Sequence, residues 1–390
     1  MVDTIVLTLS KNMFTITAPE LFKPSAHWVL SEFDRNIISK QNPSKTELRN
    51  EIYKPRLTLG QRKNTHGNRE VMLKVELSLP KLLLGNNFNE LQQKDFPELI
   101  KKLVVVLGQM GVEVTATALE KASVITIHYA KNIVFTDGAT PYHFINKIKQ
   151  ANIKLSLDVN QTDYRNEGHS HKWHCNAYEI AFYDKVRDLE MAKRSDKRSI
   201  EKDIMLSFEE IRTLQESHKL EVLRMEVRLN QRKKMKQLFK KLNITTTLTF
   251  KGLFKKMIAK KVLLHYIDEL ERTRPILLDY KPRSDQDLLA ALIVNNPHMG
   301  PKKILQLYGL KKAYDVLTPR ELRVMFAKYS TRSWYQFMDD ARNITLPNAR
   351  QATFGVLREQ VEKMTAVRLS SYKSKRRQTI SCNNSQNRAT

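Results

Sequence analysis

Residues 222–229 (VLRMEVRL) carry the clearest strand signal in the chain, because charged residues occupy every second position: Arg224, Glu226 and Arg228. A period of two is that of an extended strand, whose successive side chains point to opposite faces of a sheet. One face of this strand is therefore predicted to pack on a hydrophobic core. The other face is predicted to carry three charges.

Other stretches show the same alternation and are separated by helical patterns and polar turns. The alternating stretches are residues 3–10 (DTIVLTLS), 71–79 (VMLKVELSL), 124–130 (VITIHYA) and 177–183 (AYEIAFY). Helical spacing is found in residues 95–110, 140–152 and 186–218, whereas residues 163–176 form a polar, turn-like stretch around Gly168. Irregular alternation of strands and helices predicts an α+β domain with a largely antiparallel sheet.

The chain beyond residue 246 is helical in pattern to about residue 370, and Ser284 is a plausible helix start. Residues 301–326, with Gly309 at a turn, match a helix-turn-helix, although ordinary short helices give the same pattern. The last twenty residues are polar and basic, which predicts a disordered tail. We therefore divide the chain into an α+β domain (1–240), a basic helical domain (241–369) and a tail (370–390).

The chain is strongly basic, since 67 Lys and Arg against 41 Asp and Glu give a net charge of +26 over 390 residues. Residues 227–267 contain no acidic residue at all. An unmixed basic stretch suits the neutralisation of phosphates, so we expect it to bind nucleic acid. The candidate DNA-binding residues are Arg228, Arg232, Lys233, Lys234, Lys236, Lys240 and Lys241, followed by Lys251, Lys255, Lys256, Lys260 and Lys261.

Several classes of protein are excluded by patterns that the sequence lacks. The phosphate-binding motif G-x-x-x-x-G-K-[S/T] does not occur, so a nucleotide-driven motor is not expected. No apolar run approaches the ~18 residues of a membrane span, and no signal peptide is recognised, so we expect a cytoplasmic protein without a membrane partner. Cys175 and Cys382 are too few for a disulfide framework or a Cys-based zinc site.

Tyr183 stands at the end of a predicted strand and is followed by Asp184 and Lys185. A tyrosine hydroxyl can attack a phosphodiester without ATP if a cation offsets the developing charge and a metal or base helps to remove the proton. Lys185 would supply that cation if the strand continues to it. The alternative is that Tyr183 is an amphipathic residue that caps a sheet, as tyrosine often does.

Metal ligands could come from several His and Glu side chains. His128 and Glu226 both interrupt the polar face of a predicted strand, so both could project onto the same side of one sheet. Imidazole and carboxylate together suit Mn²⁺ or Mg²⁺. The further candidates are His169, His171, His174 and Glu179, and each of them could instead be an ordinary packed or solvated residue.

The chain resembles the replication initiators of filamentous phages, of the gene II/gene X type, and related plasmid replication proteins. The likeness lies in five short pieces in the family's order: DTIVLTL (3–9), VELSLPKLLLGNNF (75–88), VITIHYAKNIVFTD (124–137), NEGHSHKWHCNAYEIAFYDKVRDLE (166–190) and VLRMEVRL (222–229). They cover about the first 240 residues. The His-hydrophobic-His pattern of many rolling-circle endonucleases is absent, because His169-Ser170-His171 has a polar centre.

This resemblance implies a rolling-circle endonuclease-like fold that nicks one strand of a double-stranded origin and stays joined to the 5′ end through a phosphotyrosine. The family's nucleophile falls in an apolar-apolar-Tyr-x-Lys segment, which here points to Tyr183. A divalent cation, Mg²⁺ or Mn²⁺, would be held by some of His128, His174 and Glu226, while Lys185 with Arg224 would steady the phosphorus.

The implied partners are origin duplex, displaced single-stranded DNA, and the helicase and polymerase of a bacterial host. The helical C-terminal part would grip the duplex. Two alternatives remain: a conjugative-type relaxase, which shares the chemistry, and a non-catalytic DNA-binding regulator, in which the basic run and a helical reader suffice.

Overall fold

The computed structural model describes most of the chain. The described residues are 1–31, 37–44, 46–47, 52–63, 69–149, 151, 168–188, 213, 216, 220–278, 280–317, 319–326, 328–347 and 352–372. Most of the predicted helix 186–218 and most of the predicted tail 370–390 lie outside these residues. None of the helices among them is both long and apolar enough to cross a membrane.

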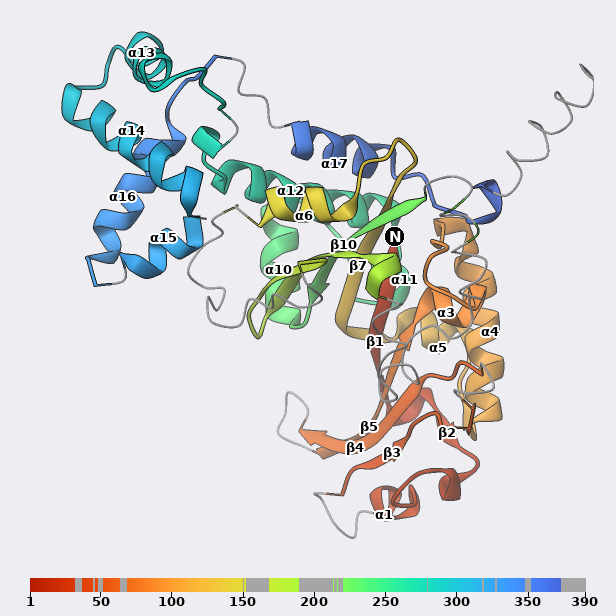
Figure 1. The fold of residues 1–390 in the computed structure, drawn as a ribbon. Coiled ribbons are helices and arrows are strands. Elements are labelled where there is room, and N and C mark those ends of the chain that lie inside the picture. The colour runs from red at the N-terminus through yellow and green to blue at the C-terminus, as the bar shows by residue number, and fades with distance from the viewer. Residues whose placement is uncertain are drawn as a thin grey trace, which may run out of the picture.

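One eight-stranded sheet dominates the structure, and its strands run in the order β3-β4-β5-β1-β7-β10-β9-β8 (Figure 1). Every neighbouring pair is antiparallel. The strands are β1 (Val2–Ser10), β3 (Ser39–Gln41), β4 (Arg56–Lys63), β5 (Arg69–Ser78), β7 (Ser123–Phe135), β8 (Ser170–His174), β9 (Tyr178–Asp184) and β10 (Glu221–Leu229). Strands β2 (Thr15–Ile16) and β6 (Val112–Glu113) form a separate pair. The predicted α+β class with a large antiparallel sheet is confirmed.

The alternation in the sequence separates the two faces of the sheet. Apolar side chains such as Leu7, Leu73 and Val227 are fully buried in a core shared with helices. Those helices are α1 (His27–Leu30), α3 (Leu79–Leu84), α4 (Phe96–Gln109), α5 (Ala116–Lys121), α6 (Pro141–Ile148), α10 (Arg232–Lys241), α11 (Phe250–Leu253), α12 (Lys256–Thr273) and α17 (Ala352–Lys363). We call the opposite side, which carries the charged residues of β10, the polar face.

The strand register arranges the polar face in rows across four strands. One row joins His128, Arg228, Glu179 and His174, on β7, β10, β9 and β8 respectively. Another row, four residues further along β7, joins Asn132, Arg224, Tyr183 and Ser170. Residues that are direct partners in an antiparallel ladder point to the same side, so both rows lie on the polar face.

Two features considered from the sequence, one of them predicted and the other an alternative, differ in the structure. Residues 170–174 form strand β8 rather than a polar turn, because they pair with β9, which no local pattern could reveal. Gly309 is not at a turn, since α14 (Pro301–Val316) continues through it and packs Leu307 and Leu310 into a core. Ser284 is a helix start as predicted, since its side chain accepts a hydrogen bond from the backbone N–H of Asp287. The predicted helix 140–152 likewise begins at its first residue, because the Thr140 side chain accepts from the backbone N–H of His143.

The helical C-terminal region has a second hydrophobic core, which starts at Leu277 and ends at Leu346. It is formed by the short 3₁₀ turn Ile276–Leu278 with α13 (Asp285–Asn295), α14, α15 (Pro319–Met325) and α16 (Thr331–Arg342). Further short 3₁₀ turns lie in the first domain, at Lys11–Met13, Pro19–Leu21 and Gln93–Asp95. The chain then returns, and α17 packs on α12 beside the sheet (Figure 1). The separate helical core therefore begins well beyond residue 241, since α10 to α12 and α17 belong to the core of the sheet.

Candidate metal centre and active site

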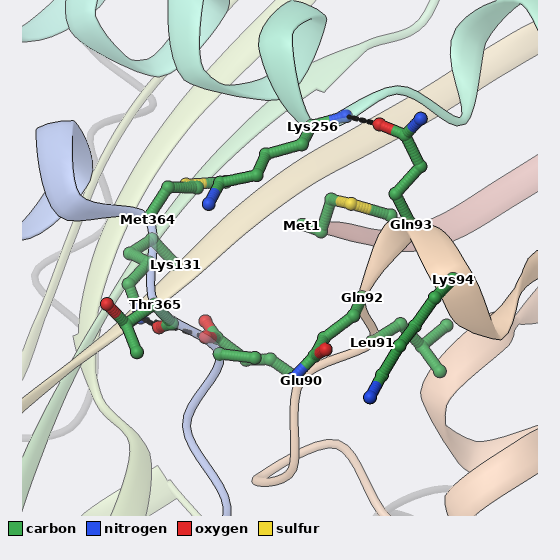
Figure 2. Close-up of a pocket in the computed structure, with 11 residues that line it drawn as sticks. Met1, Glu90, Leu91, Gln92, Gln93, Lys94, Lys131, Lys256, Met364 and Thr365 are labelled. Carbon is green, nitrogen blue, oxygen red and sulfur yellow. Dashed lines mark hydrogen bonds and ion pairs between the residues drawn. The ribbon is translucent and has the colours of Figure 1, made fainter.

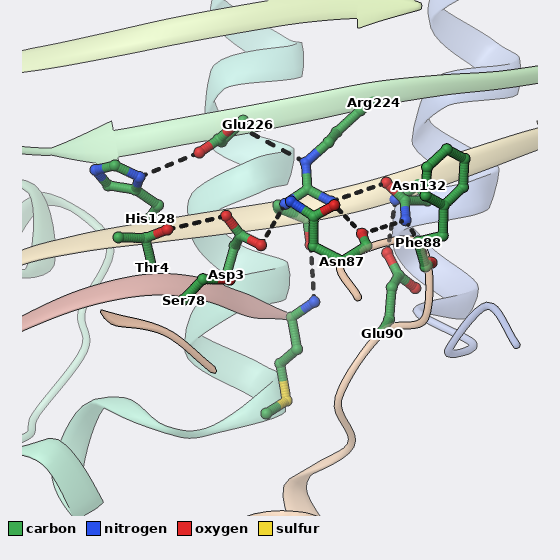
Figure 3. Close-up of polar contacts among 12 residues, drawn as sticks. Asp3, Thr4, Ser78, Asn87, Phe88, Glu90, His128, Asn132, Arg224 and Glu226 are labelled. Atoms are coloured by element: carbon green, nitrogen blue, oxygen red, sulfur yellow. Dashed lines mark hydrogen bonds and ion pairs between the residues drawn. The ribbon is translucent and has the colours of Figure 1, made fainter. Parts of the chain in front are cut away.

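Three side chains of ligand type meet on the polar face, from three neighbouring strands. Asp3 lies on β1, His128 on β7 and Glu226 on β10, and one ligand atom of each lies within 4.8 Å of the others (Figure 3). Asp3 and Glu226 are buried and His128 is half-buried. The three meet because β7 lies between β1 and β10 in the sheet.

An irregularity in the pairing of β1 with β7 helps to bring Asp3 to this place. Between the pairs Val2–Tyr129 and Ile5–Ile127, two residues of β1, Asp3 among them, oppose a single residue of β7. A bulge of this kind re-aims a side chain, and bulges are frequent beside active sites.

The Glu226 carboxylate is the centre of the polar contacts. Its Oε1 lies 3.1 Å from Nδ1 of His128, and it accepts two N–H groups of Arg228, Nε at 3.1 Å and Nη2 at 3.2 Å. The Tyr183 hydroxyl donates to Oε2 at 3.2 Å, and Nε of Arg224 lies 3.8 Å from the same oxygen. The Glu226 carboxylate thus connects the candidate nucleophile, Tyr183, with the three potential ligands Asp3, His128 and Glu226, which we call the metal-ligand group.

Asp3 is held by the guanidinium of Arg224. Nη2 of Arg224 lies 2.7 Å from Oδ1 of Asp3, and the Thr4 hydroxyl donates to Oδ2 at 3.0 Å. Arg224 is only 2% exposed, so this pair is largely withdrawn from solvent. Arg224 therefore contacts the carboxylates of both Asp3 and Glu226.

The charges of the arginines keep both carboxylates ionised. Burial by itself would raise the pKa of Asp3, but the charges of Arg224, Lys185 and His128 together more than offset it, so that pKa is lowered. Burial likewise opposes ionisation of Glu226, and the charges of Arg228 and Arg224 with the hydrogen bond from His128 hold its pKa well below the ordinary value. Two ionised carboxylates and an imidazole form a donor set that suits a divalent cation. A cation bound here would compete with Arg228 for the oxygens of Glu226.

Tyr183 lies where the sequence predicts it, near the end of β9 and on the polar face, opposite Arg224 in the register. Burial raises the pKa of its hydroxyl well above the ordinary value, and the Arg224 charge offsets only part of this effect. The hydroxyl is therefore neutral at physiological pH. Attack on phosphorus would need the proton to be removed during the reaction.

The predicted position of Lys185 was wrong in one respect. Strand β9 ends at Asp184, and Lys185 begins a helical turn instead of continuing the strand. It is nevertheless close to the site, with Nζ 6.0 Å from the ring centroid of Tyr183 and 5.3 Å from that of Phe88. Its side chain is buried, at 3% exposure.

His174 is not part of the metal-ligand group, contrary to the prediction, and Asp3 takes its place. His174 lies on β8, and β9 and β10 separate that strand from β7. Three strand spacings amount to about 14 Å, too far for two residues to share an ion. Asp3 was missed because its role depends on which strand lies beside β7. The only signal in the sequence was that Asp3 is the one acidic residue of this strand.

The other candidate ligands, His169, His171 and Glu179, also lie outside the metal-ligand group. Nδ1 of His169 is 3.2 Å from Oδ2 of Asp184. His171 is buried against the Trp173 ring, with centroids 4.3 Å apart. Glu179 pairs with Nη1 of Arg228 at 2.9 Å, one strand away from the group.

Some of the predicted DNA-binding side chains already bind other residues of the protein, and others are exposed. Arg228 belongs to the site, Arg232 donates to the Ser123 hydroxyl, and Lys241 pairs with Glu269 at 3.1 Å. The remaining members on α10 are Lys234, half-buried with Nζ 4.0 Å from the centroid of the Tyr178 ring, and the exposed residues Lys233, Lys236 and Lys240. Beyond α10, Lys251 pairs with Glu120 at 2.8 Å, Lys260 is half-buried, and Lys255, Lys256 and Lys261 are exposed. The exposed lysines of α10 are three neighbouring side chains on one helix that can make phosphate contacts.

Comparison with family models, with curated proteins and with solved structures gives no match. The proposal for function therefore rests on the geometry of the site.

Proposed function

We propose that the protein is a rolling-circle replication initiator, which nicks one strand of an origin with Tyr183 as nucleophile. The observation that carries the proposal is the hydrogen bond of 3.2 Å from the Tyr183 hydroxyl to Glu226, a member of the Asp3–His128–Glu226 group. A nucleophilic tyrosine beside a cation site is what ATP-independent cleavage of a phosphodiester requires.

The reaction conserves the energy of the broken bond. The Tyr183 oxygen attacks phosphorus, the bond from phosphorus to the 3′ oxygen breaks, and that oxygen takes up a proton to leave a 3′-OH. The 5′ phosphate remains on the tyrosine as a phosphodiester. In the reverse direction a 3′-OH attacks this phosphotyrosine and releases Tyr183, which reseals the displaced strand.

Glu226 accepts the hydrogen bond of the Tyr183 hydroxyl, so it is the group to which that proton would be transferred. Because neighbouring charges hold the pKa of Glu226 low, this carboxylate by itself is a weak base. Mg²⁺ or Mn²⁺ held by Asp3, His128 and Glu226 would supply the positive charge that favours ionisation of the hydroxyl and stabilises the phosphorane.

The expected role of Arg224 changes with its position. Its guanidinium is buried and bonded to Asp3, so in this proposal it positions the carboxylates and does not contact the phosphorus. Lys185, beside the Tyr183 ring, is the cation that supports the nucleophile. The proposed partners are origin duplex, the displaced single strand, and the helicase and polymerase of a bacterial host, in whose cytoplasm the protein would act.

A nicking assay tests the proposal directly. A supercoiled plasmid that carries the protein's own origin, incubated with Mg²⁺, should yield a nicked circle with protein attached to the 5′ end. Omission of Mg²⁺ in the presence of a chelator should prevent the reaction. Specific binding to the origin without any covalent adduct would instead support a non-catalytic regulator.

Phosphate contacts of α10 can be tested by charge reversal. Lys233, Lys236 and Lys240 are exposed, and replacing all three by Glu should weaken binding to origin and random duplex alike. Each lost phosphate contact should lower the salt slope of log K by about 0.9, so three contacts should lower it by about 2.7. Cleavage of a single-stranded oligonucleotide at saturating concentration should persist, because Tyr183 and the metal-ligand group are unchanged.

The matched control reverses three exposed lysines elsewhere, Lys101, Lys102 and Lys121 on α4 and α5, and should leave the salt slope unchanged. If the α10 variant lost only its preference for the origin, with the salt slope intact, α10 would read bases and the phosphate assignment would be wrong.

A further inference from the structure

The buried guanidinium of Arg224 has contacts beyond the two carboxylates. Its Nη1 donates to the backbone oxygen of Asn87 at 3.0 Å and to Oδ1 of Asn132 at 3.2 Å (Figure 3). One side of the guanidinium thus faces Asp3, and the other side is held by a loop and by β7. These contacts determine where Arg224, and with it Asp3, can lie.

Asn132 connects this guanidinium with the loop of residues 86–90. Its side-chain amide donates to the backbone oxygen of Phe88 at 2.8 Å, while its backbone N–H donates to Oε1 of Glu90 at 2.6 Å. Asn132 is 1% exposed. A buried amide with both ends bonded has little freedom to turn, so it is suited to hold the loop and Arg224 in register.

The loop of residues 86–90 is in turn hydrogen-bonded to residues 365–369, a segment near the end of the described chain. Oε2 of Glu90 accepts the Lys131 ammonium at 2.8 Å and the backbone N–H of Val367 at 3.0 Å, and the Glu90 N–H donates to the Val367 oxygen. The Lys131 ammonium also donates to the backbone oxygen of Thr365 at 2.9 Å. Glu90 and Lys131 are both almost completely buried.

Apolar contacts complete this arrangement. Phe88, from the loop, and Leu369, from the C-terminal segment, are buried in one small cluster with Val186 and Val222. The Glu90–Lys131 pair lines a cavity of about 380 Å³. Figure 2 shows Thr365 beside this pair. Residues 86–90 and 365–369, far apart in the sequence, therefore pack together on the side of Arg224 that faces away from Asp3.

We propose that residues 86–90 and 365–369 form a clamp that positions Arg224, with Asn132 as the residue that transmits its effect to the Asp3–His128–Glu226 group. The inference rests on the proposed function for its effect on cleavage, but its effect on cation binding can be measured independently. Partners behind a metal ligand orient it, and their loss commonly reduces metal affinity by about 10- to 100-fold.

The test compares Asn132→Ala with a matched control, Asn296→Ala. Asn296 is equally buried, and its amide bonds Leu292 and Thr345 in the helical core, remote from the site. Mn²⁺ alone, titrated by calorimetry, should bind Asn132→Ala about ten-fold or more weakly than the wild type. Asn296→Ala should bind Mn²⁺ as the wild type does, although it too loses buried hydrogen bonds.

A second pair of variants changes the contact between the two segments of the clamp at Val367. Val367→Pro removes the N–H that Glu90 accepts, whereas Val367→Ala keeps it. The proline variant should bind Mn²⁺ more weakly and form the covalent adduct more slowly, with KM for the DNA unchanged, and the alanine variant should match the wild type. This pair decides the question even if Asn132→Ala fails to fold.

The outcomes separate the two proposals. A wild-type affinity for Mn²⁺ in both Asn132→Ala and Val367→Pro would overturn the clamp, because the group would then be positioned without it. If the wild-type protein bound Mn²⁺ and the variants lost it, but no variant or wild type formed an adduct, the clamp would stand and the nicking function would fail. No binding of Mn²⁺ to the wild type would overturn both.

Discussion

Replacing Tyr183 by Phe is expected to abolish nicking and the covalent adduct while leaving affinity for origin DNA and for Mn²⁺ nearly unchanged. The substitution removes one hydroxyl, and loss of the nucleophile should slow cleavage by about a thousand-fold or more. The packing loss is small, because Tyr183 is half-buried at the polar face and keeps its ring. Since Glu226 retains its other partners, stability should fall by no more than about 1.5 kcal/mol.

The control is Tyr178→Phe on the same strand. Tyr178 points to the opposite side of β9, where its ring stacks on that of Tyr266, so this variant should nick normally. Denaturing gel electrophoresis measures the adduct in each case with DNA labelled at its 3′ end, because the fragment 3′ of the nick is the one that stays joined to the protein. An adduct that survives in Tyr183→Phe would place the nucleophile on another tyrosine, with Tyr164, which lies outside the described residues, as the next candidate.

The second large effect is expected for Glu226→Gln, which should reduce both stability and cation binding. Glu226 is buried and neutralises Arg228 and Arg224, so removing its charge should cost about 3 kcal/mol of unfolding free energy. A neutral amide also binds a hard cation poorly, so the Mg²⁺ or Mn²⁺ concentration needed for cleavage should rise about ten-fold or more.

Acid provides an independent test of the same carboxylate. The pKa of Glu226 is lowered in the folded protein, so its ionised form stabilises the fold above the ordinary value of 4.5. That contribution is lost as pH falls below 4.5 toward the folded pKa. The wild type should therefore lose stability in this range, and Glu226→Gln should lose less, as urea denaturation at pH 7 and at pH 3.5 can show.

Glu179→Gln is the matched control, since Glu179 pairs with Arg228 and Lys172 but is not one of the three ligand residues. It should lose some stability and keep the wild-type metal titration. If Glu226→Gln behaved in the same way, losing stability with an unchanged titration, Glu226 would be a structural counter-ion and not a ligand.

The sequence by itself determined the strands whose pattern is local and the face on which their charges lie. Alternation in residues 222–229 and 124–130 predicted that His128 and Glu226 share one side of a sheet, and they lie 3.1 Å apart on adjacent strands. Tyr183 was predicted on its strand for the same reason. A period of two is a property of neighbouring residues, so it can be read without knowledge of the fold.

Only the tertiary structure decided which strands are neighbours, and this decided the composition of the site. Asp3 joins the metal-ligand group because β1 pairs with β7 through a bulge, and His174 is left out because β8 lies at the edge of the sheet. The pairing of β1 with β7, which decides this, joins residues more than a hundred positions apart. Such pairings are selected by the burial of the whole core and leave no trace in any short stretch of sequence.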